Sequence, residues 1–288
     1  MTVDDRARMV ALALAGGIGW KLAGRLLAHF GTLEAVLAAS ETELCAVRGI
    51  GTQLAARIRR CDAVSAAADL ERLAVRGVVC ATVEDAHYPL AFNELDDRPL
   101  AVFWRGELQE GDRRAVGIVG TRQPSAESRG IAARWAAALS AHGWTIVSGL
   151  ARGIDSVAHR AALHAGGRTL AVLGCGIDRV YPPENAALAA AIAQDGAVIA
   201  ETHPDSPVAP ELLVLRNRLI AALSRAVIVV EAGAESGALY AARRAHLLGR
   251  TVFALPNSAG NVAALETFAR PLPGGVDVEA FVAQLQAK

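Results

Sequence analysis

From Ala115 onward, short apolar runs alternate with helix-like stretches, and this alternation constrains the fold more than any other feature of the chain. The apolar runs span residues 115–120, 145–149, 169–174, 197–201, 226–232 and 251–256. The helix-like stretches between them include residues 125–142, 155–165, 186–194 and 236–248. Short, continuously apolar strands separated by helices indicate a mostly parallel sheet that is covered on both faces. The sequence therefore predicts a doubly wound, Rossmann-like α/β domain.

Ligands of such sheets bind outside the carboxyl ends of the strands, so the residues that follow each apolar run are candidates for a functional site. Glycines, helix starts and arginines dominate these positions, and Arg152 is one of the arginines. Backbone N–H groups at helix starts and guanidinium groups both bind anions. The candidate anion-binding residues are Gly120, Arg122, Ser148, Gly149, Gly153, Gly174, Arg216, Asn217, Arg218, Ser236 and Gly237. We expect these residues to form a cradle for an anion.

Other readings of the same positions are weaker. Asp155 stands where a helix begins, so we predict that it is a structural N-cap whose loss would cost about 1 kcal/mol. His159 follows on the same helical face, and we expect Asp155 to orient it rather than to share a metal ion with it. Ser148 lacks the G-x-S-x-G setting of a serine hydrolase, and the first strand ends in "GIVGTRQPS" rather than in a dinucleotide fingerprint. We therefore expect no metal and no cofactor.

The N-terminal region contains a repeat. Residues 17–26 read "GIGWKLAGRL" and residues 49–58 read "GIGTQLAARI". A Gly-hydrophobic-Gly turn that opens an amphipathic helix is typical of a helix-hairpin-helix, because glycine permits the tight turn and the helix N-terminus can bind a phosphate. The repeat predicts a small all-α, SAM-like domain over residues 1–75, followed by the Rossmann-like domain over residues 76–288. This first domain could contact DNA, contact a protein or act as a scaffold.

Composition limits the remaining possibilities. The 29 basic residues balance the 29 acidic ones, so binding to a polyanion would require a local concentration of positive charge. The four cysteines show no C-x-x-C spacing, which favours reduced thiols in a cytoplasmic protein. Arg6 and Arg8 precede an apolar run at 9–20, but that run is too short to cross a bilayer. We expect neither export nor a membrane partner.

Several motifs together resemble one family. They are "YPLAFNELDDRPLAVFWRG" (88–106), "VGTR" (119–122), "VSGLARGID" (147–155), "AVLGCGIDRVYPPEN" (171–185), "RNRLIAALS" (216–224), "VVEA" (229–232), "SGAL" (236–239) and "GRTVFALP" (249–256). As an ordered set over residues 10–256, they resemble the DNA-processing protein A family, DprA or Smf. A helix-hairpin-helix-like domain before a Rossmann-like domain is also that family's arrangement.

The resemblance implies a protein without catalytic activity that binds single-stranded DNA as a homodimer. It implies that this protein protects incoming DNA and helps to load the RecA recombinase in natural transformation. By the same resemblance, DNA phosphates are held by Arg122, Ser148, Gly149, Gly153, Gly174 and the segment 216–218.

The chain also departs from the family pattern. Leu213 and Val214 stand where the family has Phe-Pro, Ala241 replaces a common Thr, and Asn257 follows Pro256 where Gly is usual. The family's usual sequence after residue 261 is not recognisable here, and the sequence predicts no C-terminal winged-helix domain. The resemblance therefore does not assign the surfaces for the dimer or the recombinase.

An enzymatic alternative comes from nucleotide phosphoribohydrolases, which share this variety of Rossmann fold. Their P-G-G-x-G-T-x-x-E motif is only partly matched by "PGGVDVEA" at 273–280, which lacks the G-T step. After the fifth apolar run, Glu231 or Glu235 could act as a general acid or base. This alternative remains open at the level of sequence.

Overall fold

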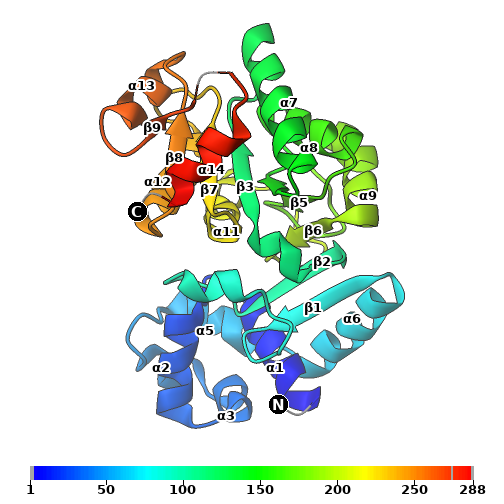
Figure 1. Ribbon diagram of the computed structural model, residues 1–288. Helices are drawn as coiled ribbons and strands as arrows, with labels where there is room; N and C mark the ends of the chain where they lie inside the picture. Colours follow the sequence, from blue (N-terminus) through cyan, green and yellow to red (C-terminus); the bar gives the residue numbers. More distant parts are fainter. Residues whose placement is uncertain (1–2, 274, 287–288) are drawn as a thin grey trace. The chain divides into compact units, whose positions relative to one another are not determined.

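The computed structural model describes residues 3–273 and 275–286, which form two compact units. Unit 1 contains the described residues up to Trp104 together with Glu201–His203, and unit 2 contains the others. The elements of unit 1 are α1 (Val3–Leu14), α2 (Trp20–Phe30), α3 (Leu33–Ala38), α4 (Glu41–Cys45), α5 (Thr52–Arg59), α6 (Ala63–Val75), β1 (Val78–Thr82), η1 (Leu90–Glu94) and β2 (Ala101–Gly106), which runs on into unit 2 (Figure 1). Unit 1 thus continues past the predicted boundary at residue 75, because β1 packs against α1 and α6 and Leu100 is buried in the helical core.

The predicted helix-hairpin-helix repeat is present in unit 1. Gly19 and Gly51 occupy the N-cap positions of α2 and α5, in extended backbone with φ of −93° and −94°. Gly17 and Gly49, at the first position of each repeat, have φ of +75° and +99°, a region that side chains other than glycine rarely adopt. The two equivalent sequences therefore form equivalent turns.

The arginine shared by the two repeats crosses from one hairpin to the other. Nη1 of Arg25, in the first repeat, donates a hydrogen bond to the carbonyl oxygen of Arg48 at 3.1 Å and lies 3.3 Å from where a Cβ of Gly49 would stand. Nη2 of Arg57, in the second repeat, lies 3.3 Å from the equivalent point at Gly17. Each turn is thus covered by the other repeat's arginine.

Unit 2 contains the predicted α/β domain. Its strands after β2 are β3 (Ala115–Val119), β4 (Thr145–Ser148), β5 (Thr169–Val172), β6 (Ala197–Ala200), β7 (Ala226–Val229), β8 (Thr251–Ala254) and β9 (Arg270–Pro271). Its helices are η2 (Glu110–Arg113), α7 (Ala126–Ala141), α8 (Ile154–His164), η3 (Pro183–Asn185), α9 (Ala186–Asp195), α10 (Pro210–Leu215), α11 (Asn217–Leu223), α12 (Gly237–Leu247), α13 (Ala259–Leu265) and α14 (Val278–Gln286). The strands lie in the order β6-β5-β4-β3-β7-β8-β9, and each neighbouring pair is parallel.

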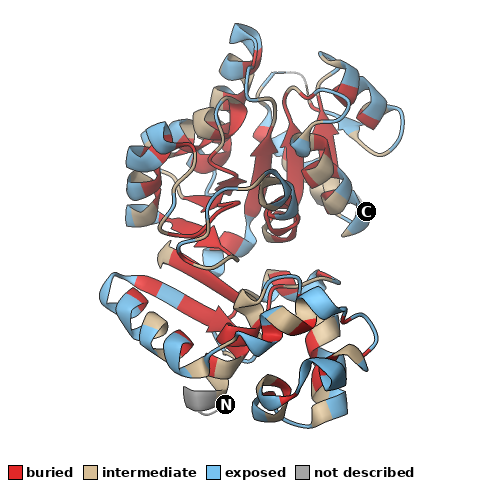
Figure 2. Ribbon diagram, turned by 180° about the vertical axis from the view of Figure 1, so that it is seen from behind, coloured by how far each residue is buried: buried red, intermediate tan, exposed pale blue. Residues whose placement is uncertain are grey.

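The sheet of unit 2 is covered on both faces, which confirms the predicted doubly wound fold. Residues of α7, α8 and α14 form one apolar cluster with β3, β4, β7 and β8, whereas α11 contacts β3, β4 and β5 and packs against α12. The strands from β3 to β7 are buried at every position, as Figure 2 shows. A strand that is buried on both faces needs apolar residues throughout, which explains why the apolar runs marked these strands in the sequence.

The C-terminal segment belongs to this core. Phe281 of α14 is 0% exposed, and its ring centroid lies 5.4 Å from that of Trp135 and 4.6 Å from that of Phe253. Residues 278–280 of the partial motif form the start of α14, which packs on the sheet, whereas residue 274 of the motif lies outside the described residues.

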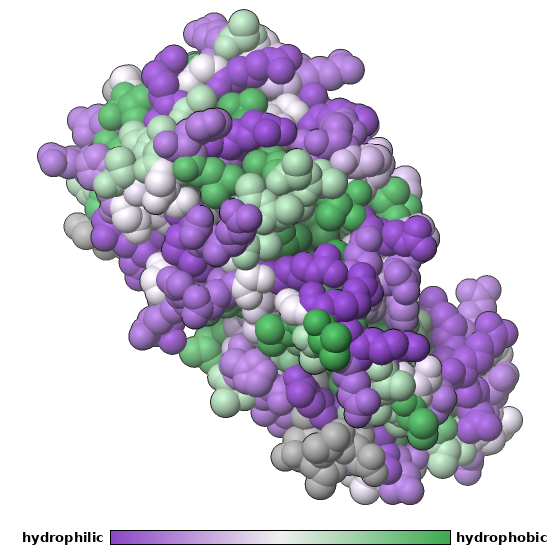
Figure 3. Space-filling view, turned by 90° about the vertical axis from the view of Figure 1, so that its right-hand side faces the viewer, coloured by the Kyte–Doolittle hydropathy of each residue, from purple (hydrophilic) through white to green (hydrophobic). Residues whose placement is uncertain are grey.

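The face of the molecule shown in Figure 3 has hydrophilic side chains interspersed with apolar ones. Among the helices in the described part of the chain, each is too short or too polar to traverse a lipid bilayer. All four cysteines are free thiols.

Candidate functional site

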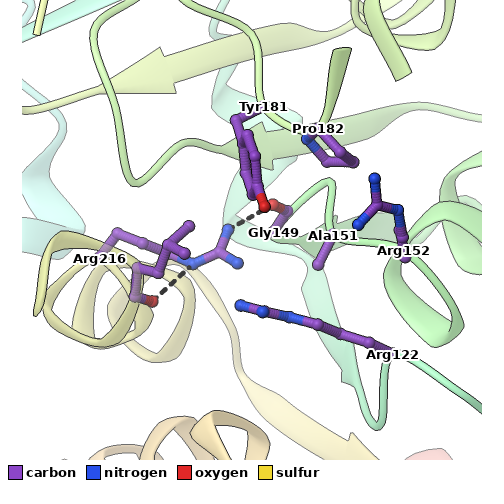
Figure 4. Close-up of a pocket in the computed structure, with 8 residues that line it drawn as sticks. Arg122, Gly149, Ala151, Arg152, Tyr181, Pro182 and Arg216 are labelled. Carbon is purple, nitrogen blue, oxygen red and sulfur yellow. Dashed lines mark hydrogen bonds between the residues drawn. The ribbon is translucent and has the colours of Figure 1, made fainter. Parts of the chain in front are cut away.

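A hollow of about 560 Å³ opens at the carboxyl ends of the strands of unit 2. It lies where the sheet changes direction, because β3 is followed along the chain by β4 on one side and pairs with β7 on the other. A smaller hollow beside it shares Arg122, Ala151, Tyr181, Leu213 and Arg216 (Figure 4). We call the two together the strand-end cleft. Its lining residues are Val119, Gly120, Thr121, Arg122, Gly149, Ala151, Arg152, Asp155, Tyr181, Pro182, Val208, Pro210, Leu213, Val214, Arg216, Asn217, Ser236, Gly237 and Ala238.

Two arginines supply the positive charge at the centre of this cleft. Arg122 follows β3 and is exposed, whereas Arg216 follows α10 and is only 6% exposed. In Figure 4 the side chain of Arg122 extends toward the guanidinium group of Arg216. Burial lowers the pKa of Arg216, and the charge of Arg122 lowers it further, whereas Asp155 acts in the opposite direction. Two cations facing each other beside one carboxylate attract an anion.

The backbone holds Arg216 in place. Its Nε donates to the carbonyl oxygen of Leu213 at 3.2 Å, and its Nη1 donates to the carbonyl oxygens of Gly149 and Val172. Its Nη2 lies 3.8 Å from Oδ2 of Asp155. The guanidinium group is thus fixed before any ligand arrives, so binding an anion would not require it to be ordered first.

Two helix N-termini face the same cleft. The first turn of α12 contributes Gly237 and Ala238 to the lining, and Nδ2 of Asn217 donates to the carbonyl oxygen of Gly237 at 2.9 Å. The N-cap of α12 is Ser236, whose Oγ accepts from the backbone N–H of Leu239. Asp155, in the first turn of α8, also lines the cleft. Helix N-termini carry partial positive charge, so they add to the attraction that the arginines exert on an anion.

Glycines allow the chain to come close together at this edge of the sheet. A Cβ at Gly149 would overlap the guanidinium group of Arg216, and a Cβ at Gly153 would overlap the carbonyl oxygen of Thr121. Gly153 also has φ of +79°, which favours glycine. Gly120 and Gly174 are also crowded, since Cβ atoms there would lie 2.5 Å from Cγ1 of Ile154 and 2.7 Å from Cα of Leu213. Gly153 and Gly174 therefore shape the cleft without being among its lining residues.

The structure places seven of the eleven candidate anion-binding residues in the lining of the cleft; besides Gly153 and Gly174, the residues Ser148 and Arg218 are not part of it. Gly120, Arg122, Gly149, Arg216, Asn217, Ser236 and Gly237 line the cleft. Ser148 is 0% exposed, and its Oγ donates to the carbonyl oxygen of Ile118 at 2.6 Å, so it ties β4 to β3. Arg218 is 2% exposed and lies outside the described lining of the cleft. Neither side chain is available to a ligand in this structure.

The predicted role of Asp155 as an N-cap is wrong. The N-cap of α8 is Gly153, and Asp155 is the second residue of the helix. Its Oδ2 instead accepts from the backbone N–H groups of Gly149 at 3.2 Å and Ala151 at 3.4 Å, so it holds the preceding loop. Burial raises the pKa of Asp155, and the nearby Arg216 opposes that shift.

His159 is not oriented by Asp155 as expected. It is 0% exposed, and its Nδ1 lies 2.6 Å from Oγ1 of Thr169. Burial lowers the pKa of His159 to about 3, with a smaller contribution from Arg216. The side chain is therefore a neutral core residue at physiological pH.

Two parts of the cleft did not emerge from the sequence. The apolar residues Val208, Pro210, Leu213 and Val214 form one side of it, and in the sequence Leu213 and Val214 were noticed only as departures from a family pattern. Arg152 was expected to contribute a guanidinium group to the anion site, and the sequence did not show that this group pairs with Glu184, an ion pair that raises the pKa of Arg152. The spacing of the residues gave no signal for either feature.

Glu231, one of the two glutamates considered as a general acid or base, accepts hydrogen bonds from Ser125. Oε2 of Glu231 accepts from the backbone N–H of Ser125 at 3.0 Å and from its Oγ at 3.1 Å. Burial raises the pKa of Glu231, but these hydrogen bonds outweigh burial and leave it below its ordinary value. A carboxylate that is held ionised is a poor general acid. Glu235 is exposed, and neither residue is among the described residues that line the cleft.

Fold and site together define a Rossmann-like α/β protein with a cationic cleft at its strand ends, preceded by tandem helical hairpins. Comparison with known families agrees with this description. The chain belongs to the DNA recombination-mediator protein A family, whose family model matches residues 79–270. A second family model, the SAM-like helix-hairpin-helix tandem, matches residues 12–61.

Individual relatives cover the chain to different extents. Protein Smf of Synechocystis is 37% identical over 263 residues, which are 90% of this chain and 66% of that protein. DNA processing protein DprA of Bacillus subtilis is 37% identical over 179 residues, which are 61% of this chain and 60% of that protein. The chain thus spans less than two thirds of the length of these curated relatives.

Two solved structures are similar to the whole chain or to a large part of it. DNA processing protein A from Streptococcus pneumoniae aligns with a TM-score of 0.80 and 29% identity, covering 97% of this chain and 98% of that one. DNA processing protein A from Helicobacter pylori, whose structure concerns its single-stranded DNA binding mode, aligns with a TM-score of 0.64 and 31% identity over 72% of this chain and 96% of that one.

Proposed function

We propose that this chain binds single-stranded DNA and that the strand-end cleft holds the DNA phosphates. The observation that carries the proposal is the pair of guanidinium groups, Arg122 and Arg216, beside the N-terminus of α12. Phosphate groups bind to guanidinium groups and to helix N-termini. The single-stranded DNA binding mode described for the Helicobacter pylori relative supports the same choice of ligand.

The shape of the site favours a single strand over a duplex. The cleft is a hollow at the strand ends, and Arg216 within it is 6% exposed. A flexible backbone can bend into such a hollow, whereas duplex DNA is stiff over about 150 base pairs. We therefore propose that duplex DNA reaches Arg122 only at the rim and binds weakly.

Competition binding tests this proposal. Labelled oligothymidylate is bound at low salt and challenged with unlabelled oligothymidylate or with duplex at equal phosphate concentration. We expect the duplex to compete at least about tenfold less well, because it loses charge-assisted contacts inside the cleft. Equal competition by the duplex would contradict the assignment of the cleft.

We further propose the role that the family resemblance implies. The chain would bind single-stranded DNA as a cytoplasmic homodimer, protect it, and help to load the RecA recombinase during natural transformation. Membership of the DNA recombination-mediator protein A family supports this role. Addition of the protein to RecA and covered single-stranded DNA should accelerate filament formation, and no acceleration together with normal DNA binding would remove this part of the proposal.

We also propose that the chain has no catalytic activity of its own. The hydrogen bonds that Ser125 donates to Glu231 support this view, because they occupy the carboxylate that a phosphoribohydrolase would need. Incubation with nucleoside monophosphates should release no free base. Release at turnover rates would instead support a phosphoribohydrolase.

A further inference from the structure

The loop that joins β3 to α7 carries Arg122, and a single residue at the end of β7 holds this loop at two points. At the start of the loop, the backbone N–H of Thr121 donates to the carbonyl oxygen of Glu231 at 2.7 Å. At its end, the backbone N–H and the Oγ of Ser125 donate to Oε2 of Glu231 at 3.0 Å and 3.1 Å. Only residues 122–124 lie between the two anchors. Glu231 therefore fixes the loop on both sides of Arg122.

The two anchors use different parts of Glu231. The first uses its backbone carbonyl, and further backbone contacts support it: the carbonyl oxygen of Thr121 accepts from the N–H of Ile154 at 3.2 Å, and its Oγ1 accepts from the N–H of Gln123 at 3.2 Å. The second anchor, at Ser125, uses the carboxylate. A substitution of the Glu231 side chain would therefore release the end of the loop and leave its start in place.

The charge of Glu231 strengthens the second anchor but opposes an anion in the cleft. Burial raises the pKa of Glu231, but hydrogen bonds from Ser125 and Ser128 outweigh burial, so the carboxylate is ionised. Hydrogen bonds to an ionised acceptor are roughly twice as strong as those between neutral groups. Glu231 is not among the described lining residues, and its negative charge would by itself repel a phosphate. Charge and loop anchoring thus predict opposite effects of Glu231 on DNA binding.

We propose that Glu231 is a positioning residue of the strand-end cleft, whose carboxylate orders the loop that presents Arg122 to a DNA phosphate. This role rests on the proposed function, because it requires that Arg122 binds phosphate. Arg122 is exposed, and an exposed side chain on a loosely held loop loses conformational freedom when it binds a ligand, which lowers affinity. The anchors at Thr121 and Ser125 reduce this cost because they order the backbone before DNA binds.

The first comparison separates anchoring from charge. Glu231→Ala and Glu235→Ala remove the same charge from the same segment after β7, but Glu235 is exposed and its carboxylate has no hydrogen-bond partner within the described part of the chain. Both variants are titrated with labelled oligothymidylate. We expect Glu231→Ala to weaken binding by about fivefold, because two hydrogen bonds to a charged acceptor are lost. Glu235→Ala should bind at least as tightly as the unchanged protein.

Two further variants test whether the carboxylate acts through Arg122. Glu231→Gln keeps an oxygen that can accept both hydrogen bonds from Ser125, so its affinity should stay within about twofold of that of the unchanged protein. In a protein that already carries Arg122→Ala, the further change Glu231→Ala should have no effect on affinity. A residue that acts only through a second residue has nothing left to contribute once that second residue is removed.

A purely structural role of Glu231 predicts a different set of results. A negative charge at the N-terminus of α7 stabilises that helix, so Glu231→Ala should lower the melting temperature in either case. If stabilising α7 were its whole role, affinity measured well below the melting temperature would not change. The positioning role instead predicts that Glu231→Ala makes the slope of log affinity against log salt shallower by up to about 0.7, the contribution of one phosphate contact.

Three results would overturn the positioning role and leave the phosphate site in place. They are unchanged or tighter binding by Glu231→Ala, equal weakening by Glu231→Gln and Glu231→Ala, and a full additional loss from Glu231→Ala in the protein that carries Arg122→Ala. A different result would contradict the proposed function itself. If Arg122→Ala alone binds oligothymidylate as tightly as the unchanged protein does, Arg122 holds no phosphate, and the positioning role falls with that assignment.

Discussion

Removing the charge of Arg122 should weaken DNA binding in a way that salt can measure. Arg122, Arg152 and Arg216 line the strand-end cleft, and Arg152 is already paired with Glu184. Each phosphate contact on a single strand contributes about 0.7 to the slope of log affinity against log salt. Two to three contacts therefore predict a slope between about −1.4 and about −2.1. Arg122→Ala should make the slope shallower by about 0.7 and weaken binding at low salt by about tenfold.

The assay is fluorescence anisotropy of labelled oligothymidylate over about 50 to 200 mM salt, with thermal unfolding in parallel. Arg225→Ala is the matched control, because Arg225 is exposed and immediately precedes β7, at the opposite end of the strands, so net charge changes equally away from the cleft. Its slope should not change. Arg218→Ala should lower the melting temperature and leave the slope unchanged, since Arg218 is 2% exposed. The reasoning is refuted if Arg225→Ala and Arg122→Ala reduce the slope equally, or if Arg218→Ala alone reduces it.

Three further outcomes are expected. The pKa of His159 is about 3 in the folded protein and about 6.5 in the unfolded chain, so the unfolded chain binds a proton first as pH falls. The free energy of unfolding should therefore drop by about 2 kcal/mol between pH 6.5 and pH 5, and urea unfolding of His159→Gln at these two pH values should lack this drop. Gly153→Ala should displace the loop that carries Arg122 and weaken oligothymidylate binding by at least about tenfold in the anisotropy assay. An unchanged affinity would show that the loop tolerates a Cβ atom at this position. Phe281→Ala should destabilise unit 2 by about 3–5 kcal/mol in urea unfolding, because it leaves a cavity beside Trp135 and Phe253. A decrease in the free energy of unfolding below about 1 kcal/mol would mean that α14 contributes little to the core.

The sequence predicted the central strands well because a strand that is buried on both faces needs apolar residues at every position. β3, β4, β5, β6, β7 and β8 all lie within the apolar runs identified beforehand. β9 escaped prediction because it has two residues, both exposed, and so carries no apolar run. β1 escaped because no motif or repeat drew attention to it, and α14 escaped because the partial motif at 273–280 was considered for its chemistry and not as the start of a helix. Short or isolated elements are stabilised by contacts with residues distant in sequence, and a local sequence pattern does not reveal such contacts.

The sequence correctly predicted at which edge of the sheet the cleft lies, but it predicted less well which side chains line the cleft. The expectation that ligands bind outside the carboxyl ends of the strands located the cleft. It could not distinguish Arg216, which lines the cleft, from Arg218, which is not among the described lining residues. Residues two apart on a helix point in directions about 200° apart, so this pair could not face one cleft together. The predicted role of Asp155 failed because the N-cap of α8 is Gly153 and the helix begins at Ile154, two residues and one residue before Asp155, and a sequence pattern locates a helix boundary only to within a residue or two.

The crossed arginines of the helical hairpins have a consequence for how unit 1 acquires its structure. Arg25 completes the turn at Gly49, and the side chain of Arg57 reaches the turn at Gly17. A duplicated motif could in principle consist of two independent copies, each able to exist without its neighbour. Here each copy lacks a contact that only its neighbour provides, so the pair should unfold in a single cooperative transition. A peptide with either copy alone would lose the arginine contact at its turn, and later change in one copy would be constrained by the other.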